Sequence, residues 1–264
     1  MNPVLAVAFA LAPFVATHLG LAWPPLRQRL VARLGRMGFT IFYSLVAWFT
    51  FGFAVSVYAA HAGEGQAGLA LGTLGPARAL LVATIALGIM LMTGSFAGYA
   101  TSPYAMSRQQ ERGPRGLERV TRHPFFVGVS LLGVAHALLA TRLVGAVFMG
   151  ILGAYALIGA RLQDAKLAAL RGDSYARFAA ASSILPFAAI TAGRQRLVLS
   201  ELPYGAMLLG LAVTAALRAL HDRLFADGGA WLIAALVIGP LVVLFDDRRR
   251  ARRAHRLAAT SALG

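Results

Sequence analysis

Two histidines lie inside apolar stretches of this chain, where hydropathy alone would not place an ionisable side chain. His18 lies between Pro3 and Trp23, and His136 lies between Pro124 and Ala140. Ionisable groups inside a membrane span are costly and usually have a function or a partner. Neither stretch contains an acidic residue that would neutralise its histidine. Neutral imidazoles are good ligands for a transition metal or a haem iron, so His18 and His136 are the candidate metal and cofactor ligands.

The other histidines have more ordinary explanations. His123 and His136 are 13 residues apart, which places them about 140° apart around a regular helix, too far for one shared site. His61, His221 and His255 lie at the ends of apolar stretches or in the C-terminal tail, where a solvated histidine is common. Even for a lone intramembrane histidine, a hydrogen bond to a neighbouring helix is the alternative to metal binding.

The composition indicates that these histidines belong to a membrane protein. Of the 264 residues 58% are hydrophobic and 13% are charged, against about 45–50% and about 25% in a soluble domain. The net charge of +15 comes from short basic blocks between apolar runs, which favours membrane topology over nucleic-acid binding. The absence of cysteine excludes disulfides, thiolate metal sites and a cysteine nucleophile.

The apolar runs predict an all-α, polytopic transmembrane helix bundle of about seven spans, with six as the alternative. A span needs about 20 apolar residues. The predicted spans are Pro3–Trp23, Gly38–Ala60, Ala77–Ala100, Pro124–Ala140, Leu143–Ala160, Pro203–Leu220 and Gly229–Phe245. With seven spans, 21 of the 25 basic residues fall on one side of the membrane. The positive-inside rule then predicts an N-terminus outside and a C-terminus in the cytoplasm.

Two further expectations concern local structure. Residues 161–178 alternate leucines with charges, which predicts a helix lying at the membrane interface. Gly128 and Gly133 lie eight and three residues before His136. Because glycine has no side chain, this face of the helix leaves room for a flat macrocycle or for another helix.

Several short motifs, in order along the chain, resemble the NnrU family. They are His18-Leu19-Gly20, Pro25-Leu26-Arg27, Leu34-Gly35, Phe42-Tyr43-Ser44-Leu45-Val46, Arg122-His123-Pro124 with Gly128 and His136, Ser183-Ile184-Leu185-Pro186-Phe187 with Gly193-Arg194, and His221 near Leu224-Phe225. The resemblance covers about residues 1–227 and predicts an NnrU-like membrane domain there. Residues 228–264 are then an added transmembrane helix and an Arg-rich cytoplasmic tail.

The resemblance implies a function as well as a fold. Bacterial members of the family are associated with denitrification, and a plant and cyanobacterial relative, 15-cis-zeta-carotene isomerase, is a haem b enzyme with histidine ligands. Its ligand positions match His18 and His136, and its other signature histidines match His123 and His61. The alternative cysteine ligand of the plant enzyme has no counterpart, because Gly133 stands there.

These matches predict a multi-pass protein of the bacterial inner membrane that binds haem b and acts on nitric oxide or on a lipophilic polyene. The protein is expected to lie in the lipid bilayer and to have respiratory enzymes as protein partners. It is not expected to bind nucleic acid. The residues do not identify a catalytic group.

A second resemblance leaves another function open. Arg122-His123-Pro124, followed by Asp164, Leu167, Gly172, Tyr175 and Pro186, is similar to the end of isoprenylcysteine carboxyl methyltransferases, where this stretch binds S-adenosylmethionine. Gln163-Asp164 stands where that family usually has glutamate. A non-enzymatic maturation factor for respiratory enzymes is the third hypothesis.

Overall fold

The first six predicted spans correspond to six apolar helices in the structure. The computed structural model describes residues 2–97, 99, 112–225 and 229–230. The apolar helices are α1 (Pro3–Ala22), α2 (Pro24–His61), α3 (Gly75–Gly94), α5 (Pro124–Leu139), α6 (Leu143–Arg171) and α9 (Tyr204–Ala219). Four of them, α1, α2, α3 and α6, are long and apolar enough to cross a membrane, while α5 and α9 are shorter. The chain is therefore a multi-pass membrane protein. Most of the predicted seventh span lies outside the described residues.

Short helices connect the long ones, and the described residues form no strand apart from one isolated bridge between Ala67 and Arg142. The short α-helices are α4 (Leu117–Val120), α7 (Asp173–Ala181) and α8 (Ala188–Thr191). The 3₁₀ turns are η1 (Leu71–Thr73), η2 (Leu199–Glu201) and η3 (His221–Arg223). The all-α prediction is confirmed for this part of the chain.

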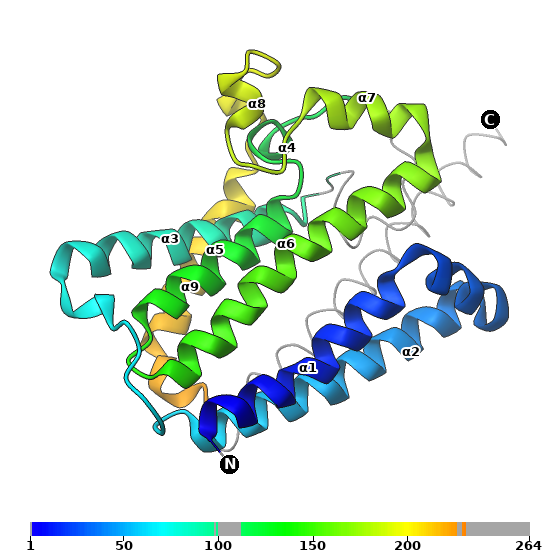
Figure 1. The fold of residues 1–264 in the computed structure, drawn as a ribbon. Helices are drawn as coiled ribbons and strands as arrows, with labels where there is room; N and C mark the ends of the chain where they lie inside the picture. Colours follow the sequence, from blue (N-terminus) through cyan, green and yellow to red (C-terminus); the bar gives the residue numbers. More distant parts are fainter. Residues whose placement is uncertain (1, 98, 100–111, 226–228, 231–264) are drawn as a thin grey trace, which may run out of the picture.

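The long helices pack side by side in an order that differs from their order in the sequence. Helices α1 and α2 form an antiparallel pair, and α1 contacts α6 (Figure 1). Helix α5 lies between α6 and α3, and α9 packs on α3. The resulting sequence of neighbours is α2, α1, α6, α5, α3 and α9. Helix α5, which carries His136, is thus near the middle of the bundle, while α1, which carries His18, is on the other side of α6.

Glycines allow α5 to approach both of its neighbours closely. A Cβ atom added at Gly133 would lie 2.6 Å from the carbonyl oxygen of Met149 and 2.7 Å from the amide nitrogen of Gly153, both on α6. On the other side of α5, a Cβ added at Gly88 of α3 would lie 2.7 Å from the carbonyl oxygen of Gly128. Such close backbone packing is typical of helices in lipid. Helices, and not a macrocycle, therefore cover Gly128 and Gly133.

Several predicted boundaries were wrong; α3, for example, ends at Gly94, ahead of the predicted Ala100. Helix α2 begins at Pro24, ahead of the predicted Gly38, and it bends at Gly35, whose φ of 71° and ψ of 166° only glycine adopts easily. The predicted interfacial helix over 161–178 is two helices, since α6 continues to Arg171 and α7 begins at Asp173. Gly172 lies between them with a φ of 50°, a left-handed value that ends α6 and turns the chain.

Three of the four predicted cytoplasmic segments meet at one end of the bundle. Lys166 interacts electrostatically with Arg27 and with Arg171. Arg122 forms an ion pair with Asp164. Helices α4, α7 and α8 cover this end (Figure 1). We call it the basic end; the fourth basic segment, the tail, lies outside the described residues.

Candidate functional site

His18 lies in a cage of aromatic rings between three helices. Its ring centroid is 4.4 Å from that of Tyr43 on α2, 5.1 Å from that of Phe14 on α1, and 5.6 Å from that of Tyr155 on α6. The Nδ1 atom of His18 is buried and has no hydrogen-bond partner among the described residues. A buried ring nitrogen with no partner is costly, and coordination to a metal would satisfy it. His18 therefore fits the role of a ligand.

His136 lies near the end of α5 and faces a second histidine. Its Nδ1–H donates to the carbonyl oxygen of Leu132 over 2.9 Å. This bond fixes the ring and leaves Nε2 as the atom with a free lone pair, as in many metal-bound histidines. The ring of His221, in η3, is parallel to that of His136 within 10°, with the two centroids 6.4 Å apart. Residues 85 positions apart in the sequence thus present two imidazoles to each other.

The structure does not bring His18 and His136 together. Among the described residues, the ring contacts of His18 are aromatic side chains of α1, α2 and α6, and the ring contact of His136 is His221. His61 lies at the end of α2, where its Nδ1 is 2.8 Å from the Glu64 carboxylate in an exposed ion pair. The ring contacts of His18 and of His136 are therefore separate, and each residue fits a ligand role in its own surroundings.

A different group of predicted residues does converge, at the basic end. His123 Nε2 donates to Asp164 Oδ1 over 2.5 Å, and the Tyr175 hydroxyl donates to the same oxygen. The Arg122 guanidinium donates through Nε to Asp164 Oδ1 over 3.2 Å and through its terminal nitrogen to Oδ2 over 2.9 Å. We call these four residues the Asp164 cluster. It joins the loop before α5 to α6 and α7.

The Asp164 cluster is largely closed to solvent. His123 and Tyr175 are buried, with 1% and 3% of their surfaces exposed. Burial and the Asp164 carboxylate both raise the pKa of the Tyr175 hydroxyl above its usual value, so this group stays a proton donor. Oδ1 of the carboxylate accepts from three donors of the chain, and Oδ2 accepts from one. The cluster therefore holds three elements together, and the buried Nδ1 of His123 is its one ring nitrogen without a partner in the described chain.

Two further carboxylates fix the loop at residues 112–123. Glu118 is fully buried and pairs with Arg112 over 2.6 Å. Glu201, in η2, accepts from both Nε and the terminal nitrogen of Arg119, over 2.8 and 2.9 Å, and from the Gly116 amide over 2.8 Å. These contacts lower the pKa of Glu201 to about 2. The contacts of Glu118 and Glu201 thus fix the loop that leads into the Arg122-His123-Pro124 motif.

His221 is the residue whose place sequence reasoning missed. It was interpreted as a solvated residue at the end of a span, and its side chain is indeed half exposed. A signal was present, because the fourth and sixth predicted spans run in the same direction and His136 and His221 lie near their C-terminal ends. An equal depth in the membrane did not show that the two rings would face each other, because the direction of a side chain also depends on how its helix is rotated about its axis.

The comparison with known families agrees with the sequence motifs. The NnrU protein family matches residues 6–227, which include α1 to η3 and all of the histidines discussed above except that in the tail. No curated protein and no solved structure matches the chain. Because the match covers most of its length, the chain belongs to the NnrU family.

Proposed function

We propose that this protein binds haem b within the membrane, with His136 as one iron ligand, and acts in nitrogen-oxide metabolism. The observation that carries the proposal is the parallel pair of His136 and His221. The two ring planes are within 10° of parallel and their centroids lie 6.4 Å apart, so His136 and His221 are the two imidazoles that would hold a haem iron at this place.

The surroundings of the pair support the same proposal. The Leu132 carbonyl holds the Nδ1 proton of His136, which leaves Nε2 as the coordinating atom. His221 belongs to a short 3₁₀ turn after α9, so its ring is less constrained than that of His136. His136 and His221 are the residues that would hold a haem here, with His136 the more rigidly placed of the two. The haem would supply an iron that can bind nitric oxide or the double bond of a lipophilic polyene.

His18 remains the alternative second ligand, because its buried Nδ1 has no partner in the described chain. Its use would require α1 to move relative to α5, since α6 lies between them. The location of the protein in the bacterial inner membrane and its work with respiratory enzymes are part of the proposal and rest on the resemblance to denitrification proteins.

The visible spectrum of the protein extracted from membranes tests the proposal. We expect a Soret band from the wild-type protein and a changed band on addition of nitric oxide. His136→Ala should abolish or strongly reduce haem content, while His61→Ala, at an exposed ion pair, should leave it unchanged. Comparing His221→Ala with His18→Ala identifies the second ligand. A wild-type protein without a Soret band, or an unaltered spectrum in His136→Ala, contradicts the proposal.

A second candidate function is S-adenosylmethionine-dependent methyl transfer. The specific observation in its favour is the Asp164 cluster, which gathers Arg122, His123, Asp164 and Tyr175 as the methyltransferase resemblance predicts. Since donors of the protein already occupy the Asp164 carboxylate, the His123 Nδ1 atom is the group left to contact a cofactor. Calorimetric titration of the wild-type protein with S-adenosylmethionine tests this candidate, and a null titration rejects it. Where binding is seen, His123→Ala should remove it.

A further inference from the structure

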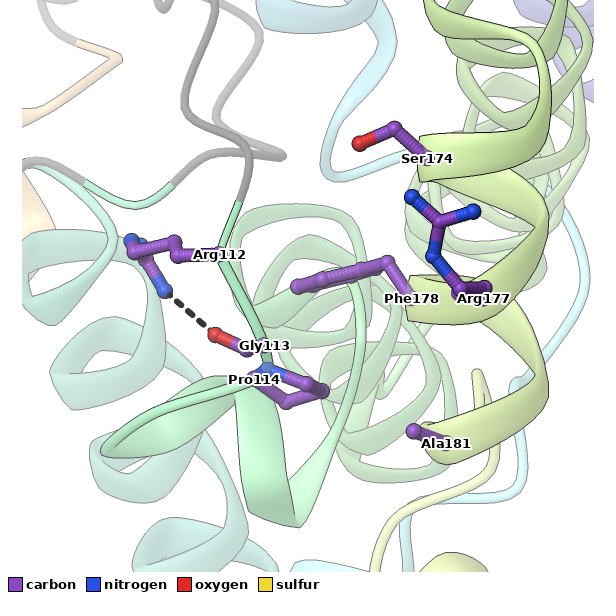
Figure 2. Close-up of a pocket in the computed structure, with 7 residues that line it drawn as sticks. All are labelled: Arg112, Gly113, Pro114, Ser174, Arg177, Phe178 and Ala181. Carbon is purple, nitrogen blue, oxygen red and sulfur yellow. Dashed lines mark hydrogen bonds between the residues drawn. The ribbon is translucent and has the colours of Figure 1, made fainter.

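A pocket opens at the basic end, beside the Asp164 cluster but distinct from it. Its volume is about 270 Å³ and its walls come from the loop at 112–114 and from α7 (Figure 2). Phe178 projects into the middle of this space, Arg112 and Pro114 lie on one side, and Ser174 and Arg177 lie on the other. The cavity therefore combines an apolar floor with two guanidinium groups on opposite walls.

Three arginines and two carboxylates of the described chain lie at or near the pocket. Arg112 is held by Glu118 over 2.6 Å and by the Gly113 carbonyl over 3.0 Å, and Arg171 interacts electrostatically with the same two residues, Arg112 and Glu118. Arg177 forms no ion pair with any carboxylate in the described part of the chain. Asp173, on the same helix, is exposed and likewise unpaired there. The guanidinium groups of Arg112 and Arg177 thus both line the cavity, and that of Arg177 forms no ion pair with a described carboxylate.

We propose that this pocket binds one phosphate-bearing ligand between Arg177 and Arg112. Arginine presents a planar fork of donors that matches a phosphate, and charge-assisted bonds of this kind are about twice as strong as neutral ones. Ser174, with its hydroxyl on the pocket wall, is the second residue of α7, where helix amides carry partial positive charge. Phe178 and Pro114 contact the carbon part of the ligand.

Two sources of such a phosphate exist at the basic end, a lipid headgroup and a soluble phosphate. Leu170 and Leu185 are exposed at this end, with 61% and 69% of their surfaces accessible, and exposed leucines beside basic residues favour contact with lipid headgroups. Both sources share the phosphate group, and two probes separate them. The probes are dihexanoyl phosphatidylglycerol, a short-chain lipid phosphodiester, and inorganic phosphate.

The test uses the full-length protein in a non-ionic detergent, with binding measured by native mass spectrometry and calorimetry. The wild-type protein should bind one molecule of at least one probe, and Arg177→Ala should weaken that binding about tenfold. Arg161→Ala is the matched control, because Arg161 is exposed on α6 and does not line the pocket. Arg177→Lys should recover only part of the affinity, since the charge returns without the fork.

Binding of the lipid alone identifies a headgroup as the ligand, and binding of inorganic phosphate identifies a soluble source; either result supports the site. The inference is overturned when neither probe binds, or when Arg161→Ala weakens binding as much as Arg177→Ala, which indicates a diffuse positive surface. Equal unfolding temperatures of the variants exclude a loss of fold as the cause of weaker binding.

Discussion

Replacing the Asp164 carboxylate by an amide should destabilise the protein more than any other change of a single charge at the basic end. Asp164 accepts hydrogen bonds from His123, Tyr175 and Arg122 at once. In Asp164→Asn the new amide group points donors at the Arg122 guanidinium, and one oxygen remains for His123 and Tyr175. The asparagine side chain therefore has nearly the shape of the aspartate, but the mostly buried positive charge of Arg122 is left without its carboxylate partner.

The size of the effect follows from burial. Breaking a buried ion pair by removing one partner costs about 3–5 kcal/mol. The side chains of Arg122 and Asp164 are 13% and 23% exposed, so water compensates part of this cost and we expect about 2–3 kcal/mol. For a chain of this size each kcal/mol lowers the unfolding temperature by about 2–4 °C. The expected decrease is therefore about 4–12 °C.

Thermal unfolding of the detergent-purified protein, followed by tryptophan fluorescence at one scan rate, measures this decrease. Asp173→Asn is the matched control, because Asp173 is exposed on α7 and a surface change of this kind costs less than about 0.5 kcal/mol. Tyr175→Phe removes one donor of the cluster and should cost about 1 kcal/mol. Its effect should largely disappear in the Asp164→Asn background, since the two residues share one interaction.

Two results would refute this reasoning. Equal unfolding temperatures for Asp164→Asn and Asp173→Asn would mean that the Asp164 cluster does not stabilise the basic end. Additive effects of Asp164→Asn and Tyr175→Phe would mean that the two residues do not interact energetically, in spite of their contact.

Two further predictions test the packing and the loop contacts. Gly133→Ala should destabilise the bundle by about 1–3 kcal/mol, because its Cβ would meet the α6 backbone; Gly20→Ala, where a Cβ meets nothing within 4 Å, is the control in the same unfolding assay, and equal effects would contradict the prediction. Glu201 has a pKa lowered from 4.5 to about 2, so its bond to the Gly116 amide should persist above about pH 4.5 and weaken as the pH falls towards 2. The protection factor of the Gly116 amide, which is the exchange rate relative to its intrinsic rate, should decrease over that interval in the wild-type protein and should not depend on pH there in Glu201→Gln, whose amide does not titrate; the same pH dependence in that variant would contradict the assignment.

The spans could be predicted from the sequence because burial in lipid is a local property of each segment. Helix α5 begins at the predicted Pro124, and α1 begins at the predicted Pro3. The prediction failed where a single backbone conformation decides the outcome. Gly172, with its left-handed φ, divides the predicted interfacial helix in two, and Pro24 and Gly35 begin and bend α2, none of which alters the hydropathy profile.

The Asp164 cluster could be predicted in part. The distribution of basic residues placed the segments that hold Arg122, His123, Asp164 and Tyr175 on the same side of the membrane, the methyltransferase resemblance named them together, and the structure joins them through one carboxylate. What the residues did not indicate is that three donors meet at one carboxylate oxygen, because the number of donors that reach Asp164 depends on the turn at Gly172 and on the position of α7.

The sequence by itself determined the class of the protein, its apolar helices, its family and its set of intramembrane histidines. Composition and residue order are sufficient for these properties, because the cost of placing a side chain in lipid depends on that side chain. Only the tertiary structure decided that His136 faces His221 and that His18 lies in a separate aromatic cage. The physical reason is that these pairings depend on the order and rotation of the packed helices, which are set by contacts between residues far apart in the chain, such as those of Gly133 with α6.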